Sequence, residues 1–319
     1  LSALIVLKKD SVNGKPVQGA TFQLRYLGGT SGSEGTVIGQ KTTSVNGTAI
    51  WTRLKAGTYI VEEIEAPDGY NIVTAMKTVY ISGKDQDVIT VEFDNQPDGN
   101  LLIKKVCSVN PSVTLANAQF KVTYADGTLI GNDNGIYTTD ANGEILISNL
   151  EPGKSVVVTE VRAPDGYIID TQPQTIVIKA GQTVSLTFQN QPKGELIIEK
   201  RDSVTGEVLP GAEFRLTTAA GCEVGLDGVI GDSTLTQNGI FTTDAQGQIH
   251  ITGLQPGAYI ITEIKAPDGY VIDSPTTTVV IGTNGDTQHV IIKNTPQGSL
   301  IIEKRDSVSK ELLAGATFK

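Results

Sequence analysis

Three polar residue types interrupt the apolar stripes of predicted strands, in the same order, three times along the chain. A lysine comes first, a glutamate follows on a later strand, and an asparagine closes the set at a spacing that is nearly constant. The three sets are Lys8, Glu63 and Asn95; Lys105, Glu160 and Asn190; and Lys200, Glu263 and Asn294. Side chains two apart in a strand share a face, so each of the nine continues an apolar stripe, as Lys8 does after Leu4 and Val6. All nine are therefore predicted to point toward a core.

Lysine, glutamate and asparagine side chains brought together in a core could form a covalent bond. Burying a lone ammonium or carboxylate is costly, and burial lowers the pKa of a lysine and raises that of a carboxyl group by up to about 3–5 units. A neutral amine beside a protonated acid can attack the side-chain amide of asparagine, while the acid polarises the carbonyl and moves protons. Ammonia leaves, and the product is an isopeptide bond. Each site reacts only once and does not turn over. Apart from this single reaction within the chain, no enzymatic activity is predicted.

A simpler interpretation is that these residues are polar strand ends that emerge into water. An exposed lysine–glutamate pair is common and contributes little to stability. For one isolated set this alternative is the better one. The recurrence of the same three residue types in the same phase in three units favours the crosslink.

The elements that must position these residues follow from an internal repeat, which decides the architecture. The motif A-P-D-G-Y begins at residues 66, 163 and 266, and an apolar strand ending in lysine occurs four times, the last at Lys304. The repeat predicts domains at residues 1–97, 98–192 and 193–296, with 297–319 as the first strand or strands of a truncated fourth repeat. Lys304 is predicted to be unpaired, because this segment lacks the strands that carry the glutamate and the asparagine in the other repeats.

Each repeat is predicted to be an all-β sandwich. Apolar residues alternate with a period of two, and no segment has a sustained helical period. Turn pairs such as Asn46-Gly47 and Asn142-Gly143 separate the strands at spacings of about 8–12 residues. About seven short strands in roughly 95 residues are typical of a sandwich. Short links that contain proline predict an elongated rod of tandem modules. The third repeat is longer because of a glycine-rich insertion at residues 219–233.

The combined motifs resemble a known family. The succession L-x-I-x-K, G-A-x-F, L-x-x-G-x-Y-x-x-x-E-x-x-A-P-x-G-Y and an asparagine-terminated strand is similar to the CnaB (SpaA-type, prealbumin-like) domains of Gram-positive pilins and surface adhesins. The resemblance spans essentially the whole chain. The second repeat departs from it locally, with Asn117 for the usual glycine and Lys154-Ser155 where the others have a small residue and tyrosine. No LPxTG-like sorting motif and no YPK-type pilin lysine occurs in this sequence.

This resemblance implies a seven-stranded, inverse-immunoglobulin or transthyretin-like sandwich that forms its own isopeptide bond. Carried over residue by residue, Glu63, Glu160 and Glu263 are the catalytic residues. The implied crosslinks are Lys8–Asn95, Lys105–Asn190 and Lys200–Asn294.

Composition excludes several other function classes. With 25 basic against 35 acidic residues, the net charge of −10 argues against a nucleic-acid surface. No apolar run approaches the roughly 18 residues that a membrane-spanning helix needs, so no membrane span is predicted. His250 and His289 have no counterparts in the other repeats, and the turns at residues 132–135 and 140–143 resemble only fragments of calcium loops, so no metal or other cofactor is predicted. Two cysteines, Cys107 and Cys222, are expected to be free thiols.

The leading prediction is an extracellular structural role, as a stalk or fibre-shaft segment on a bacterial cell surface or cell wall. Its partners would be neighbouring repeats of the same chain or fibre. The alternative is an adhesin module that binds a host or surface ligand through its inter-strand loops, either residues 27–35 or the insertion of the third repeat. Near-identical repeats favour the structural role, because a binding tip is usually a distinct domain.

Overall fold

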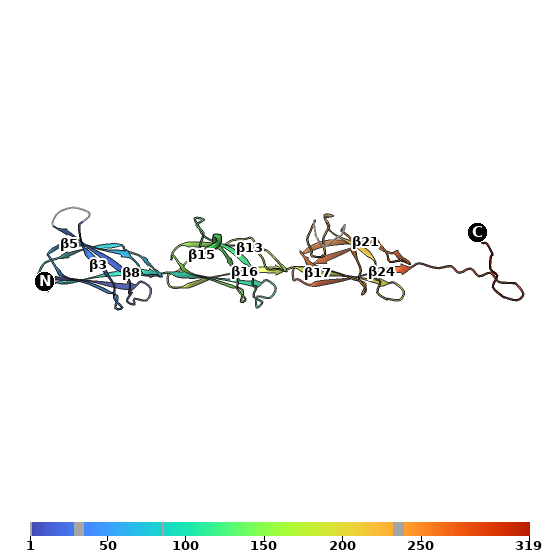
Figure 1. Cartoon of the computed structure of the whole chain (residues 1–319), viewed down its shortest axis with the longest axis horizontal. Helices are drawn as coiled ribbons and strands as arrows, with labels where there is room; N and C mark the ends of the chain where they lie inside the picture. The colour runs from blue at the N-terminus through green and yellow to red at the C-terminus, as the bar shows by residue number, and fades with distance from the viewer. Residues whose placement is uncertain (1, 29–34, 85, 232–238) are drawn as a thin grey trace. The chain divides into compact units, whose positions relative to one another are not determined.

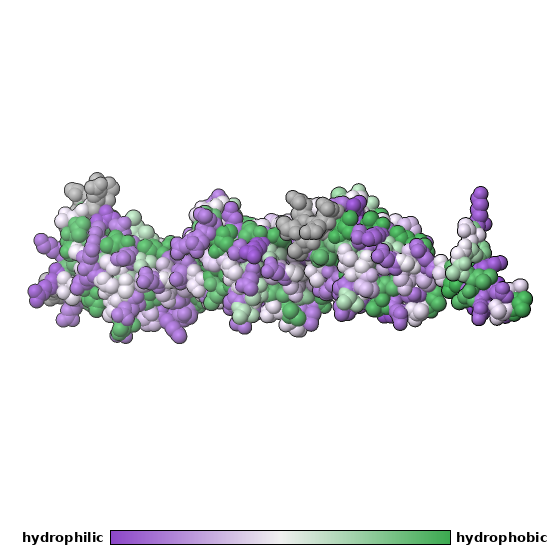
Figure 2. Space-filling view, turned by 45° about the vertical axis from the view of Figure 1, so that its right-hand side comes forward, coloured by the Kyte–Doolittle hydropathy of each residue, from purple (hydrophilic) through white to green (hydrophobic). Residues whose placement is uncertain are grey.

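The computed structural model describes residues 2–28, 35–84, 86–231 and 239–319, and it is built from strands (Figure 1). Three tandem domains each consist of two four-stranded sheets, which confirms the predicted all-β sandwich. No helix in the described ranges is long and apolar enough to span a membrane. On the face shown in Figure 2, hydrophobic and hydrophilic residues are interspersed.

The strands of the three modules follow the same order along the chain. The first module has β1 (Ser2–Asp10), β2 (Thr21–Gly28), β3 (Thr36–Thr42), β4 (Thr48–Leu54), β5 (Gly57–Glu65), β6 (Tyr70–Ile72), β7 (Met76–Ile81) and β8 (Val88–Pro97). The second has β9 (Gly99–Cys107), β10 (Gln119–Tyr124), the 3-10 helix η1 (Asp133–Gly135), β11 (Ile136–Thr138), β12 (Glu144–Leu150), β13 (Ser155–Arg162), β14 (Tyr167–Ile168), β15 (Gln174–Val177) and β16 (Thr183–Pro192). The third has β17 (Gly194–Asp202), β18 (Glu213–Thr218), β19 (Phe241–Thr242), β20 (Gln248–Leu254), β21 (Gly257–Lys265), β22 (Tyr270–Ile272), β23 (Thr276–Ile281) and β24 (Thr287–Pro296).

The eight described strands of each module form two sheets whose order repeats. In the first module these are β4-β1-β8-β6 and β3-β2-β5-β7; in the second, β12-β9-β16-β14 and β11-β10-β13-β15; in the third, β20-β17-β24-β22 and β19-β18-β21-β23. The sequence predicts about seven strands, and the additional one is the strand of two or three residues that begins at the tyrosine of A-P-D-G-Y.

The first and last strands of each module are parallel neighbours in one sheet. In the first module β1 pairs with β8, with Lys8 opposite Phe93 and Asp10 opposite Asn95. A parallel pair needs a long connection between its strands, and here almost the whole module lies between them. The first and last strands of a module therefore lie side by side in the middle of one sheet.

The interior of each module is apolar and closely packed. Strand alternation directs Leu4, Val6, Phe22 and Phe93 into the first core, where each is at most 1% exposed. The rings of Phe22 and Phe93 pack edge to face with centroids 4.9 Å apart, a favourable arrangement for aromatic pairs. The same alternation carries the lysine of β1 inward at the end of the stripe.

Residues 297–319 contain no strand. They form one isolated bridge, Arg305 to Leu312, and Leu300, Ile301 and Lys304 are exposed. In the three modules the first strand is paired on both sides, as β1 is by β4 and β8. Residues 297–319 have no such flanking strands in the described chain, and this segment forms a turn but no sheet (Figure 1).

Candidate functional site

The three residue types predicted to react come from two facing sheets and meet inside each module. The lysine lies on the first strand, the asparagine on the last strand beside it, and the glutamate on the central strand of the opposite sheet, at β5, β13 or β21. All nine side chains are buried, none belonging to a residue more than 4% exposed. The sequence pattern therefore predicted correctly that these residues face the core. The alternative of solvent-exposed strand ends is wrong.

In the first module the three side chains form a closed ring of hydrogen bonds. Lys8 Nζ donates to Glu63 Oε2 at 2.7 Å and to Asn95 Oδ1 at 2.6 Å. The Nδ2 atom of Asn95 donates to Glu63 Oε1 at 2.6 Å. Each carboxylate oxygen thus accepts from one partner, and the amine lies directly against the amide that it would attack.

The third module has the same ring. Lys200 Nζ donates to Glu263 Oε2 at 2.9 Å and to Asn294 Oδ1 at 2.5 Å, and Asn294 Nδ2 donates to Glu263 Oε1 at 2.7 Å. The first and third modules thus share one arrangement of donors and acceptors.

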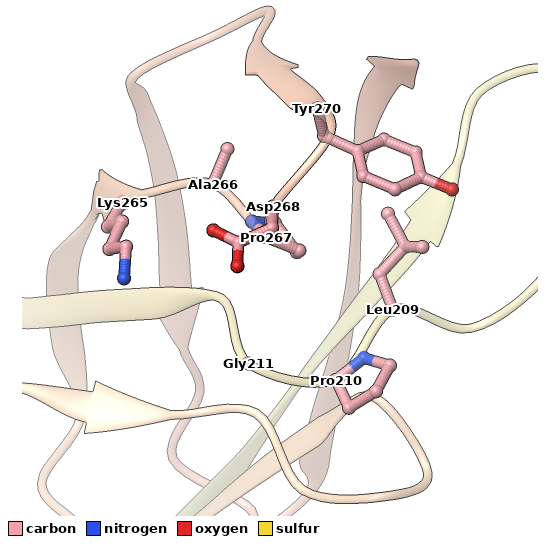
Figure 3. Close-up of a pocket in the computed structure, with 8 residues that line it drawn as sticks. All are labelled: Leu209, Pro210, Gly211, Lys265, Ala266, Pro267, Asp268 and Tyr270. Atoms are coloured by element: carbon pink, nitrogen blue, oxygen red, sulfur yellow. The ribbon is translucent and has the colours of Figure 1, made fainter. Parts of the chain in front are cut away.

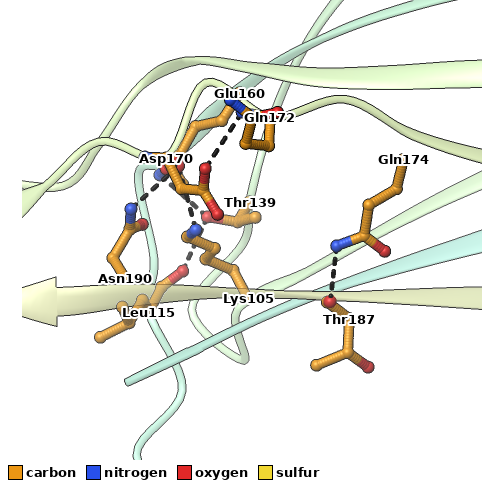
Figure 4. A network of polar contacts seen from close by, with 10 residues as sticks. Lys105, Leu115, Thr139, Glu160, Asp170, Gln172, Gln174, Thr187 and Asn190 are labelled. Carbon is orange, nitrogen blue, oxygen red and sulfur yellow. Dashed lines mark hydrogen bonds and ion pairs between the residues drawn. The ribbon is translucent and has the colours of Figure 1, made fainter. Parts of the chain in front are cut away.

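In the second module the contacts converge on one atom. Lys105 Nζ donates to Glu160 Oε2 at 3.1 Å, and Asn190 Nδ2 donates to the same oxygen at 2.9 Å. A third donor, the backbone N–H of Asp170, reaches this oxygen at 3.0 Å (Figure 4). The lysine, glutamate and asparagine are together here as well, but their hydrogen bonds are distributed differently.

Aromatic rings enclose the lysine amine and keep water away from it. Lys8 Nζ lies 5.8 Å from the ring centroids of both Phe22 and Phe93, and Lys105 has two phenylalanine neighbours at 5.7 and 5.9 Å. Lys200 has one, Phe214, at 5.7 Å. The first of these phenylalanines is the one in the G-A-x-F pattern, so that motif builds a wall of the site.

Burial sets the protonation of the lysines. Loss of hydration lowers the pKa of Lys8, and the hydrogen bond and negative charge of Glu63 oppose that shift without cancelling it. Burial likewise lowers the pKa of Lys105 and Lys200, opposed in each case by the partner glutamate. All three amines therefore lose their proton more readily than an exposed lysine does.

A buried threonine holds the lysine strand of each module in place, and sequence reasoning missed it. Thr43 Oγ1 accepts from the backbone N–H of Ala20 at 3.0 Å and donates to the carbonyl of Val17 at 2.8 Å, while the Val17 N–H bonds the Lys8 carbonyl. Thr139 and Thr243 make the same pair of bonds. A repeated Thr-Thr pair, at residues 42–43, 138–139 and 242–243, was the available signal.

The two local departures of the second module leave its site intact. Asn117 has φ of 65°, in the left-handed region that Gly19 and Gly211 occupy in the other modules, and asparagine tolerates this region better than most residues. Val156, one residue after Ser155, is fully buried and takes the core place of Tyr59.

Other groups singled out in the sequence lie apart from this site. His250 contacts Glu195 and His289 contacts Glu199, two residues of β17 that alternate with Lys200 and so face away from it. Within residues 2–28, 35–84, 86–231 and 239–319, no group of three or more histidine, cysteine or acidic side chains could hold a metal ion. Both cysteines are free, Cys107 buried and Cys222 exposed.

The loops considered for ligand binding are only partly covered by the structure. Residues 29–34 of the first loop and 232–233 of the insertion lie outside the described residues. The described part of the insertion forms two isolated bridges, Thr217 to Glu223 and Val224 to Ile230.

A pocket of about 390 Å³ lies beside the A-P-D-G-Y turn of the third module (Figure 3). Its lining consists of Leu209, Pro210, Gly211, Lys265, Ala266, Pro267, Asp268 and Tyr270. The hydroxyl of Tyr270 donates to Asp202 at 2.9 Å, as Tyr70 donates to Asp10 at 3.0 Å in the first module. The tyrosine thus ties the turn to the end of the lysine strand, and the pocket contains none of the three reactive side chains.

Comparison with solved structures gives only distant overall matches. The Bacillus anthracis TIE protein is 28% identical over 92% of this chain, with a TM-score of 0.42, and this chain spans only 50% of its length. A streptococcal ancillary pilin is 20% identical (93% of this chain, 99% of that one, TM-score 0.37), and BcpA, the major pilin subunit of Bacillus cereus, is 19% identical (93% and 99%, TM-score 0.36). None of the curated proteins matches the chain.

The family itself is shown by a match that repeats three times. Residues 2–97, 99–192 and 194–296 each match the model of the SpaA domain, described as a prealbumin-like fold domain. These ranges cover most of the 319 residues and include every lysine, glutamate and asparagine of the three buried sites. The chain therefore belongs to the SpaA family of prealbumin-like fold domains, of which it carries three tandem copies.

Proposed function

We propose that each module closes one isopeptide bond between its lysine and its asparagine, with the glutamate as proton carrier, and that the chain serves as a structural segment of a bacterial surface fibre or stalk. The observation that carries this proposal is the contact of a buried amine with a buried amide, 2.6 Å from Lys8 Nζ to Asn95 Oδ1 and 2.5 Å in the third module. If the lysine and glutamate served only as a buried ion pair, an asparagine in contact with the lysine would not be required.

The proposed reaction balances within the three side chains. A proton moves from the lysine ammonium to the glutamate, which leaves a neutral amine and a protonated carboxyl. The amine nitrogen attacks the amide carbon of asparagine while the carboxyl polarises the carbonyl oxygen. The new C–N bond forms, the old C–N bond breaks, and the glutamate carries one of the two amine protons to the departing nitrogen, while the other stays on the isopeptide nitrogen. Ammonia is the only product released.

The intact mass of the purified chain tests this reaction directly. We expect the chain to be lighter than its sequence by three ammonia molecules, one for each complete module. Replacing Glu63, Glu160 or Glu263 by alanine is expected to restore one ammonia each, because the proton carrier is lost. Glu62→Ala is the matched control, since Glu62 is adjacent on β5 but bonds Arg25 at 2.7 Å near the surface. An unchanged intact mass of the unsubstituted chain would rule the crosslinks out.

Acidic conditions are expected to slow bond formation. Burial lowers the pKa of each reactive lysine, so at a given pH a larger fraction of the amine is neutral than for an exposed lysine. As pH falls through that lowered pKa, the amine gains a proton and loses the lone pair that it needs for attack. Timed mass spectra of freshly synthesised chain in acidic and mildly alkaline buffers measure this effect. Faster ammonia loss at the acidic pH would contradict the proposed nucleophile.

The structural role follows from where the bond would lie. Lys8 is on β1 and Asn95 is on β8, the strands through which the chain enters and leaves the module. A bond between them would pass tension from one strand to the other and leave the residues between them unloaded. Three such modules in tandem would make a chain that resists extension, which is the property that a surface stalk requires.

A further inference from the structure

The three buried sites differ in how the glutamate is used. Glu63 and Glu263 each accept the lysine on Oε2 and the asparagine on Oε1. Glu160 accepts Lys105, Asn190 and the backbone N–H of Asp170 all on Oε2. Figure 4 shows these groups converging from three directions on the Glu160 carboxylate. No sequence motif distinguishes the three sites, since their reactive residue types are identical.

The additional donor lies in a loop whose two flanking strands are each longer in the other modules. β7 begins with Met76 opposite Glu62, and β23 begins with Thr276 opposite Thr262. In the second module Gln174 pairs with Val158, as Lys77 pairs with Val61 in the first. Pro173, the residue before Gln174, therefore occupies the position that Met76 and Thr276 hold in the other modules. Proline has no N–H for a strand pair and restricts the residue before it, so β15 begins only after it.

The strand on the other side of this loop is also shortened. β6 extends to Ile72 opposite Asn95, and β22 extends to Ile272 opposite Asn294. β14 ends at Ile168, opposite Gln191. Residues 169–173 therefore belong to neither sheet, and the backbone N–H of Asp170 donates to Glu160. The side chain of Asp170 accepts a hydrogen bond from the N–H of Gln172.

Three N–H donors occupy one oxygen of Glu160, and one of them, the backbone N–H of Asp170, belongs to no reacting group. The proposed reaction needs this carboxyl to take up a proton and to give it to the asparagine amide, so a fixed donor on the same oxygen must be displaced first and opposes the reaction. One additional hydrogen bond to a charged group changes an equilibrium by about tenfold or more. The lysines do not distinguish the modules in this way, because burial lowers the pKa of Lys105 against the charges of Glu160 and Asp170 just as it lowers that of Lys200 against Glu263 and Asp273.

We infer that the second module crosslinks more slowly than the first and third, and that the Asp170 backbone N–H, delivered by the loop that Pro173 opens, is the positioning group that delays it. This inference rests on the proposed function, since it concerns the rate of the same reaction. A newly made chain would then contain one module that stays extensible after its neighbours are locked.

Timed synthesis of the full chain tests the order of crosslinking. The chain is made in a cell-free system, stopped at intervals with acid and denaturant, digested, and analysed by mass spectrometry for the linked and unlinked peptides of each module. We expect Lys105–Asn190 to form about tenfold more slowly than Lys8–Asn95 and Lys200–Asn294. Equal extents of linkage in the three modules at every time point, including complete linkage in the first sample, would overturn the inference.

The variant Pro173→Thr tests the cause, because threonine is the residue at this place in the third module. Restored pairing is expected to bring the rate of the second module to within about twofold of the others, an acceleration that a purely structural role of this loop does not predict. Pro111→Thr is the matched control, in an exposed turn of the same module, and is expected to leave the rate unchanged. A slow second module that Pro173→Thr does not accelerate would overturn the role of the loop. Absence of linked peptides from all three modules would contradict the proposed function instead.

Discussion

Pulling the Asn95→Ala variant by its two ends is expected to release one extension step of about 290 to 310 Å that the unsubstituted chain does not show. The separation of Lys8 and Asn95 is 87 residues, and each released residue contributes about 3.3–3.6 Å at full extension. With the bond intact, the residues between them lie within a covalent loop that the applied force bypasses. Without it, β1 and β8 are held only by their parallel pairing and by packing.

The reason for so large a difference is that the two failure modes have different barriers. A noncovalent sandwich under load fails at a rate set by its unfolding barrier. A crosslinked module can lengthen by only the few residues outside its loop unless a covalent bond breaks. The bond therefore changes the outcome from full extension to almost none.

Single-molecule force spectroscopy on the whole chain measures these steps. Thr90→Ala is the matched control, because Thr90 is exposed on the same strand as Asn95 and faces away from the site. This control is expected to behave like the unsubstituted chain. Steps of module length in the unsubstituted chain would show that β1 and β8 are not joined, and the structural role would lose its mechanism.

Replacing Lys8 by alanine is expected to lower the melting temperature of the first module by about 20 to 35 °C. By analogy with a disulfide, a covalent loop of 87 residues stabilises the fold by roughly 4.6 kcal/mol through its effect on the unfolded chain. The variant also removes a fully buried side chain that contacts Glu63, and the cavity left in the core adds to the loss. The second and third modules should melt as before, because tandem units contribute largely independent stabilities.

Differential scanning calorimetry resolves the separate transitions. Lys9→Ala is the control on the same strand, since Lys9 and Glu92 form an exposed pair at 2.7 Å, and such pairs contribute about 0–1 kcal/mol. A common loss of stability in all three modules would contradict the independence of the modules. A first module that melts as before would contradict the crosslink.

The departures from expectation have particular physical causes. Asn117 replaces a glycine without damage because the backbone there needs a left-handed conformation that asparagine also adopts. The bonds of Thr43, Thr139 and Thr243 reach backbone groups that are distant in sequence, so the repeated Thr-Thr pair marks these residues without showing which groups they bond. The eighth strand is too short to produce a detectable alternation of apolar and polar residues.

The repeat, the all-β class and the inward direction of Lys8, Glu63, Asn95 and their counterparts could all be predicted from the sequence. These follow from strand alternation, which is a local property: a side chain in phase with an apolar stripe must face the same way as the stripe. The chemistry proposed for the three residue types also follows from their identities, given that they are buried.

Which atoms of these side chains meet depends on the packing of the two sheets and could not be predicted. The glutamate reaches the lysine from the opposite sheet, far along the chain, so its contacts depend on how the two sheets pack and on how the loops between them close. That is why the same three residues form a closed ring around Glu63 and Glu263 but share one oxygen of Glu160. Pro173 lies just before β15, and the loop that precedes it supplies a backbone donor, a group that every residue except proline carries and that no sequence motif marks.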